Sequence, residues 1–245
     1  MLFFSNRSNL HLDCFTKRQE VFDYAKIESA TNFLPKWWKD LPKTRITDNF
    51  LPLPTMKTCV GMVDYYKLGL IYPLWSDISF LVGSKTEPNF KWNFADGISD
   101  ADIHPTFQRG GYLPPEEYQH IKLYSPWLLS CKEDLNWSMT QPTWNFDALG
   151  QIHIVPGLMN FNYIPQPNIN IFLRRGDESY SFLIKHGQPM MHILPMSNKK
   201  IVLHHHLVDE KEYAKINYKV PRLSFSNNFR KFLNIKNKCP FHNHD

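Results

Sequence analysis

Residues 151–195 constrain the fold of this chain most strongly, because their apolar positions follow a period of two. In 152–154 and again in 169–173, apolar side chains recur at every second position, which is typical of strands that bury one face. Residues 174–178 contain a Gly-Asp turn, and Gly187-Gln188-Pro189 turns the chain again before a further apolar run. This pattern predicts two short strands joined by a hairpin, within a compact antiparallel unit.

The composition points to the same fold class. Eighteen prolines against ten glycines, spread along the chain, favour many short strands and rigid loops over long helices. With 42% hydrophobic and 15% aromatic residues, 245 residues can bury a sizeable core as one large domain or two closely packed ones. We therefore predict a mainly β (α+β) protein with a few short helices.

Local periodicity and turn residues predict further elements. Cys59–Ile71 carries apolar residues at spacings of three and four, which predicts a helix that ends at Gly69, and Ile78–Phe94 is expected to form a hairpin. The other expected elements are an edge strand pair at Leu2–Arg7 and Leu10–Phe15, a short helix within Glu20–Glu28, an extended linker over Thr44–Thr55, a strand at Lys200–Val208 and a helix capped by Asp209.

Two segments are expected at the surface. Trp37 and Trp38 are adjacent on a short element between prolines, so both cannot point into one core, and one should cover a seam while the other faces a loop or a partner. Residues 99–118 are polar and rich in glycine and proline. They should form a loop or lid, and long loops of this kind are where the rim of a pocket is expected.

The charge is concentrated near the C-terminus. The formal net charge is +5, and the segment from Lys211 to Lys238 carries eight Lys or Arg against one acid, Glu212. A solvated terminal helix and a surface for nucleic acid both fit such a segment. We divide the chain into an N-terminal extension with the Trp-Trp segment (1–55), a β-rich core domain (56–210) and a basic C-terminal helical segment (211–245).

The cysteines and the apolar segments of the sequence indicate the cellular compartment. Cys14, Cys59, Cys131 and Cys239 are far apart and form no Cys-x-x-Cys pair, so free thiols in a reducing cytoplasm are the simplest expectation. The sequence shows no secretory signal and no apolar run of about 18 residues. We expect no membrane association.

Residues 156–195 resemble the C-terminal half of the trimeric deoxyuridine-triphosphatase-like β-clip fold. The resemblance rests on Pro-Gly, two apolar residues, Asn-x-Asn-Tyr, a hairpin and Gly-x-Pro-Met-Met-His-Ile. It implies an antiparallel β-clip or barrel-like core, with Tyr163 where that family stacks a deoxyribose and Asn160 where it keeps a water-activating aspartate. An amide cannot take a proton from water as a carboxylate can, and the family's Arg-Ser-Gly phosphate loop has no match.

A second resemblance spans more of the chain. Lys36-Trp37-Trp38-Lys39 before Leu-Pro, residues 56–74 with Gly69-Leu-Ile-Tyr-Pro-Leu, Ser125-Pro-Trp127 and Gly187-Gln-Pro occur in this order. The sequence is similar in this respect to an uncharacterised phage and bacterial domain-of-unknown-function family, of the type found in tailed phages of marine cyanobacteria. The resemblance implies a source and a shared fold, and no reaction.

Eleven histidines raise the question of a metal. On a strand, His204 and His206 project to one face and His205 to the other, but spacing fixes no third ligand. The tail from Cys239 to Asp245 also holds zinc-compatible donors. His153 and His192 lie within residues 151–195, where strand pairing is one way to bring them together. The alternative is that each is a histidine of the core or of a pocket, with its hydrogen bonds satisfied. We therefore predict no metal ligands and no cofactor.

Motifs of catalysis are missing from the sequence. It contains no Gly-x-Ser-x-Gly, Walker or Gly-x-Gly-x-x-Gly motif, and Asp96, Asp100 and Asp102 lie in a turn-rich stretch where aspartate is common. We predict no catalytic residue. The predicted ligand-binding residues all lie within residues 151–195: His153, Asn160, Tyr163 and His192.

Three functions stay open. High aromatic content without catalytic motifs favours a non-catalytic structural or protein-binding protein, and the second resemblance implies that it is phage-encoded. It would bind a protein partner or its own copies, in the host cytoplasm or incorporated in the virion. The second is a nucleotide- or metal-dependent enzyme with a β-clip-like core, and the third is a nucleic-acid-associated protein that uses Lys211 to Lys238.

Overall fold

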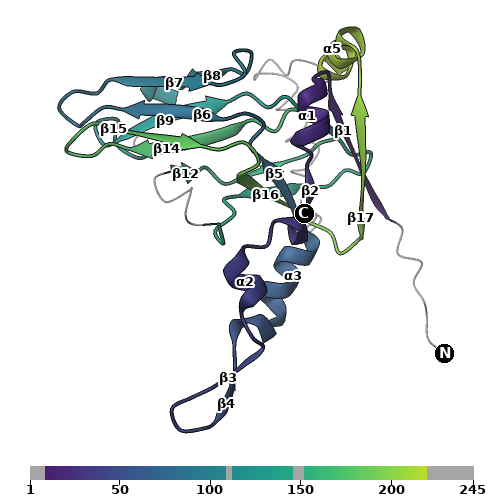
Figure 1. The fold of residues 1–245 in the computed structure, drawn as a ribbon. Coiled ribbons are helices and arrows are strands. Elements are labelled where there is room, and N and C mark those ends of the chain that lie inside the picture. The colour runs from purple at the N-terminus through teal and green to yellow at the C-terminus, as the bar shows by residue number, and fades with distance from the viewer. Residues whose placement is uncertain (1–8, 109–111, 146–151, 220–245) are drawn as a thin grey trace, which may run out of the picture.

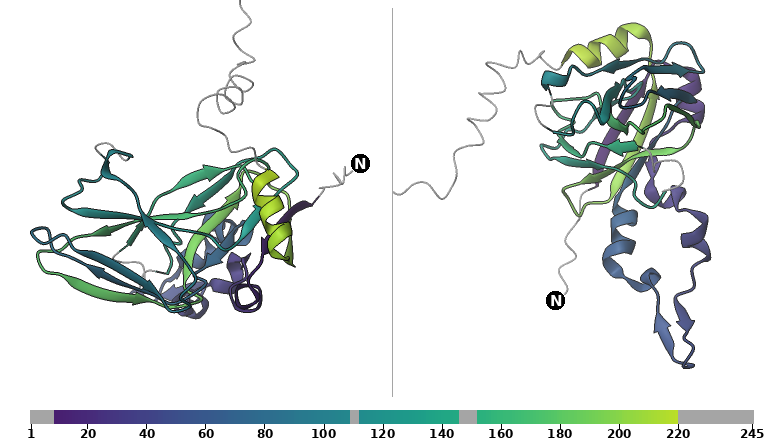
Figure 2. Two further views of the ribbon diagram at one scale, coloured as in Figure 1. Left: turned by 90° about the horizontal axis from the view of Figure 1, so that it is seen from above. Right: turned by 90° about the vertical axis from the view of Figure 1, so that its left-hand side faces the viewer.

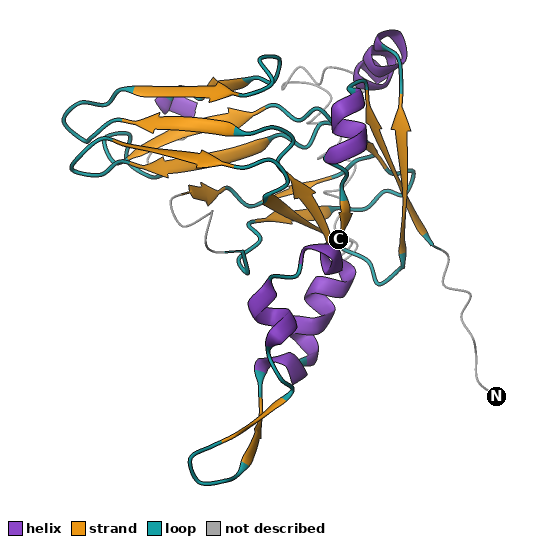
Figure 3. Cartoon of the chain, in the orientation of Figure 1, coloured by secondary structure: helices purple, strands orange, loops and turns teal. Residues whose placement is uncertain are grey.

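A β-rich body and a narrow arm that projects from it make up the described part of the chain (Figure 1). The computed structural model describes residues 9–108, 112–145 and 152–219. Strands in several mostly antiparallel sheets dominate these residues, and the helices are few and short (Figure 3). The predicted mainly β class is confirmed. The predicted strand at 2–7, residues 220–238 of the basic segment and the donors of the tail lie outside the described residues.

Two sheets form one end of the body and appear as separate layers in the left view of Figure 2. Both place alternate apolar side chains in one shared core cluster, which is the periodicity expected of sheets with one buried face. The first sheet has the order β12 (Ile152–Ile154), β14 (Ile169–Arg174), β9 (Tyr118–Leu123) and β8 (Ala101–Ile103). The second has the order β15 (Tyr180–Ile184), β6 (Ile78–Val82) and β7 (Phe90–Phe94). The predicted 78–94 hairpin is confirmed, with Ile78 opposite Phe94.

Two more sheets complete the body. A five-stranded sheet has the order β13 (Gly157–Met159), β11 (Trp137–Thr140), β16 (Pro189–Pro195), β5 (Leu70–Pro73) and β2 (Glu28–Ser29). A three-stranded sheet has the order β10 (Leu128–Ser130), β1 (Leu10–Thr16) and β17 (Ile201–Leu207). In it, β1 runs antiparallel to β10 and parallel to β17. The expectation that 10–15 lies at a sheet edge is wrong, because β1 is the middle strand; the domain division stays a prediction.

The helices lie outside the sheets. The α-helices are α1 (Gln19–Tyr24), α2 (Lys36–Asp40), α3 (Val60–Leu68) and α5 (Glu210–Lys219), and short 3-10 helices cover Ala30–Phe33, Met56–Thr58 and Thr106–Gln108. Asp209 caps α5 as predicted, since its Oδ1 accepts a hydrogen bond of 2.8 Å from the Glu212 amide. None of the helices within the described ranges is long and apolar enough to cross a membrane.

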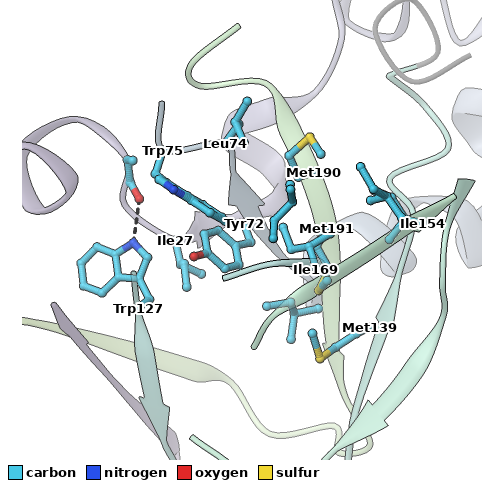
Figure 4. Close-up of a cluster of buried hydrophobic side chains, with 14 of the residues drawn as sticks. Ile27, Tyr72, Leu74, Trp75, Trp127, Met139, Ile154, Ile169, Met190 and Met191 are labelled. Carbon is cyan, nitrogen blue, oxygen red and sulfur yellow. Dashed lines mark hydrogen bonds between the residues drawn. The ribbon is translucent and has the colours of Figure 1, made fainter. Parts of the chain in front are cut away.

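Two large buried side chains of the core, Trp127 and Tyr72, have hydrogen-bond partners for their polar ends. Trp127 is fully buried and donates from Nε1 to the Ala25 carbonyl at 3.0 Å (Figure 4). The buried Tyr72 hydroxyl lies 2.8 Å from Ser125 Oγ, which also accepts from the Trp127 amide. A buried hydroxyl or indole N–H without such a partner would cost stability, so these bonds allow large rings to fill the junction between the sheets.

The hairpin predicted around residues 174–178 is not formed. β14 pairs with β9 and β12, whereas β15 pairs with β6 in the other layer. The Arg175 amide donates to the Glu117 carbonyl at 2.7 Å, and the Gly176 carbonyl accepts from the Lys85 amide at 3.1 Å. The turn therefore bonds to both layers and carries the chain from one sheet to the other instead of folding it back.

Residues 44–55 form a paired hairpin in the arm, and the extended linker predicted there is wrong. The arm comprises α2, β3 (Thr44–Ile46), β4 (Pro52–Pro54) and α3. β3 and β4 pair as an antiparallel hairpin whose tip points away from the body in Figures 1 and 2.

Candidate functional site

The four predicted site residues do not form one site. His153 lies on β12 in the four-stranded sheet, whereas His192 lies on β16 in the five-stranded sheet. Asn160 and Tyr163 lie in the turn that follows β13. Strand pairing does not join the two histidines, because β12 pairs with β14 while β16 pairs with β11 and β5.

Asn160 holds the turn together. The residue is 6% exposed, its Nδ2 donates to Asp134 Oδ1 at 2.7 Å, and its Oδ1 accepts from the Asn162 amide at 3.0 Å. Its carbonyl accepts from the Tyr163 amide at 3.0 Å. Both ends of the amide therefore bond within the protein, as in an Asx turn. The position that the β-clip resemblance aligns with a water-activating acid has a structural role here.

We expect Asn160→Asp to destabilise the fold by about 2–3 kcal/mol at neutral pH. The substitution replaces a donor to Asp134 by a second carboxylate, and this new carboxylate is buried at position 160 beside the exposed Asp134. Urea unfolding at pH 7 measures the loss, and the two proteins should approach equal stability in acid, where one carboxyl of the pair is protonated. Triphosphatase activity gained by this variant would contradict the structural role.

His192 is a core histidine. It is 1% exposed and contacts two aromatic rings of α3, with ring centroids 4.3 Å from Tyr65 and 5.6 Å from Tyr66. Within the described ranges its Nε2 has no hydrogen-bond partner. Burial lowers the pKa of His192 to about 4, because desolvation disfavours the imidazolium. This ring is therefore neutral at physiological pH.

His153 lies at the edge of a cavity on the outer face of the four-stranded sheet. The cavity has a volume of about 360 Å³. Its floor includes the stacked rings of His120 and Phe172, with centroids 4.4 Å apart. His104 and Tyr112 come from the predicted 99–118 loop and line the cavity, and the Tyr112 hydroxyl lies 3.3 Å from His153 Nε2. The prediction that this segment forms the rim of a pocket is confirmed, although it also contains β8 and a 3-10 turn.

A second cavity, of about 420 Å³, lies over the three-stranded sheet. Sequence reasoning did not find it, because its walls come from segments 193 residues apart. The signal in the sequence was the alternation Leu10-His-Leu-Asp-Cys14, which places two polar residues on one face of a strand. The cavity is lined by His11, Asp13, Lys132, Glu133, His204 and His206.

The tip of the arm carries exposed apolar side chains. Phe50 is 88% exposed at the hairpin turn, where it adopts a positive φ of 59°, a conformation that is uncommon outside glycine. The other large apolar side chains exposed on or beside the hairpin are Ile46, Leu51, Leu53, Met56 and Val60. Six apolar side chains within fifteen residues are more than the scattered single ones of an ordinary surface.

The base of the arm is packed against the body. Trp144, from the loop after β11, lies with its ring centroid 4.1 Å from those of Trp38 and Tyr66. The Trp37 Nε1 donates to the Trp144 carbonyl at 3.2 Å, and Trp37 is 44% exposed whereas Trp38 is 5% exposed. The prediction that the adjacent tryptophans divide between a buried and a surface position is confirmed.

No family model matches this chain, and no curated protein sequence matches it either.

Proposed function

We propose that this chain is a phage-encoded, non-catalytic protein that binds another protein through its arm. One observation carries the proposal: the hairpin β3–β4 holds Ile46, Phe50, Leu51 and Leu53 more than half exposed, on an element that projects from the body. Fully burying one such side chain is worth about 1.5–3 kcal/mol. The tip is therefore able to supply the buried centre of an interface.

The arm is suited to binding because it is already ordered. An isolated two-stranded hairpin is at best marginally stable in water. Here the Thr55 amide donates to the Lys43 carbonyl at 2.9 Å, and Lys57 Nζ donates to the Lys39 carbonyl at 2.9 Å. Together with the Trp38–Trp144 packing at the base, these contacts reduce the entropy lost when a partner docks.

The two prolines of β4 favour recognition by side chains over strand addition. The ladder bonds run from the Thr47 amide to the Leu51 carbonyl and from the Thr55 amide to the Lys43 carbonyl. Pro52 and Pro54 fall between these bonded positions, where an N–H would point outward. A proline there removes no ladder bond and offers no donor to an incoming strand.

The charge of the arm indicates the chemistry of the partner. Between residues 36 and 68 the sequence has six Lys or Arg and three Asp. A complementary partner therefore presents an apolar groove with an acidic rim, because complementary charges steer association and fix its register.

Crosslinking from the arm tests the proposal. A photoreactive phenylalanine at position 50 should give one dominant adduct with a different protein, in producing cells or in purified particles. The same residue at position 183, an exposed leucine of the body (47% exposed), should not give that adduct. The pair Leu51→Ser and Leu53→Ser should abolish the adduct while changing stability by less than about 0.5 kcal/mol.

Three outcomes would overturn it. Equal adducts from positions 50 and 183 would show random collision, and an adduct that survives both serine substitutions would exclude the tip as the contact. Adducts only with a second copy of the chain would replace the proposed partner by self-association.

A further inference from the structure

The parallel pairing of β1 with β17 assembles a group of metal-ligating side chains. The register places Asp13 opposite His204 and Phe15 opposite His206. Because side chains alternate along strands, His11, Asp13, His204 and His206 all face the cavity of about 420 Å³. His205 faces the other way, with its Nε2 2.9 Å from the Ile27 carbonyl.

The donors are already close to ligand-to-ligand separations. His11 Nδ1 lies 2.9 Å from His204 Nε2, and His206 Nε2 lies 2.8 Å from Asp13 Oδ1. Two nitrogens on one tetrahedral zinc ion, each about 2.0–2.1 Å from it, are roughly 3.3 Å apart. A small opening of the His11–His204 pair would therefore admit an ion between two imidazole lone pairs.

We propose that this cavity binds a divalent transition-metal ion of the zinc class, held by His11 Nδ1, His204 Nε2 and the Asp13 carboxylate. Within the described ranges no three such side chains yet surround one point. Binding therefore turns Asp13 from His206 toward His204, its neighbour across the strand pair. The spacing of the His204–His206 run alone fixed no third donor, and β1 provides two candidates.

The surroundings suit an exchangeable ion. The side chains of His206 and Asp13 are 40% and 30% exposed, so an ion can enter and waters can complete its coordination. The positive charge of Lys132 opposes a cation, whereas the carboxylates of Asp13 and Glu133 line the same cavity and favour it. The imidazole nitrogens coordinate only when they are neutral, so the ion competes with protons for them.

Titration of the full chain tests the site. After treatment with a chelator and its removal, Zn²⁺ added in a calorimeter should bind at one site that His204→Ala removes. The loss in affinity should exceed the roughly 10- to 100-fold cost of losing an outer-shell partner. Co²⁺ should give the visible absorption of a site with imidazole nitrogen ligands in the wild type and not in His204→Ala.

Two matched variants separate this site from other histidines. His205→Gln changes the next residue on the opposite face and should keep the ion, as should His242→Ala combined with His244→Ala in the tail. Zn²⁺ should raise the melting temperature of the wild type and of both controls, and leave that of His204→Ala unchanged. Unchanged Zn²⁺ affinity in folded His204→Ala, or loss of the ion in the tail variant, would overturn the proposal.

Discussion

Replacing Gly69 by alanine is expected to lower the free energy of unfolding by about 3 kcal/mol or more. A Cβ at this position would lie 1.7 Å from Nε2 and 2.5 Å from Cδ2 of His192. The imidazole cannot move aside easily, because it is buried against Tyr65 and Tyr66. Chemical denaturation measures the change, and the dependence on denaturant should stay similar if the native fold is retained.

Gly61, near the start of α3, provides a matched control. A Cβ at Gly61 would meet nothing within 4 Å. Gly61→Ala should therefore stabilise the protein by about 0.5–1 kcal/mol through helix propensity alone. Equal effects of the two substitutions would show that Gly69 makes no special contact. In a double-mutant cycle, His192→Ala should relieve much of the cost of Gly69→Ala, because it removes the clashing ring.

Gly69 also shows a limit of prediction from local sequence patterns. The helix does end there, at Leu68, as the sequence predicted. Glycine after a helix often adopts a left-handed conformation, yet Gly69 has a φ of −94°, which any residue can adopt. Glycine is required by a strand that lies more than 100 residues further along the chain, and no local pattern records that contact.

Local and long-range pairings differ in the same way. The 78–94 hairpin was predictable because its strands are adjacent in sequence and share one period. The 174–178 turn carries equally strong turn residues, but its backbone bonds to Glu117 and Lys85 decide which sheet receives the next strand. The likeness to a β-clip fold stays a prediction.

The candidate sites show the same difference between local and long-range features. The 99–118 rim was predictable from composition, since long polar loops border pockets. Asn160 and His192 were selected for their place in a sequence pattern, and their contacts give them structural roles. The histidine cavity was missed, because the parallel pairing of β1 with β17 is the least local pairing of the fold.

Acidification is expected to remove about 3 kcal/mol of stability through His192. Its pKa is about 4 in the folded protein, against an ordinary value of 6.5. The unfolded chain therefore binds a proton more readily, so this contribution is fully present above pH 6.5 and is lost as the pH falls toward 4. Denaturation curves at several pH values in this range measure the slope.

His192→Leu separates this residue from the other titrating groups. Leucine does not titrate and is able to occupy the apolar space between Tyr65 and Gly69, so stability should depend less steeply on pH in the variant than in the wild type. His205 acts in the same direction, because burial also lowers its pKa, and it is unchanged in both proteins. Parallel stability curves for the two proteins, or an NMR titration that shows His192 protonated near pH 6.5, would contradict a buried neutral ring.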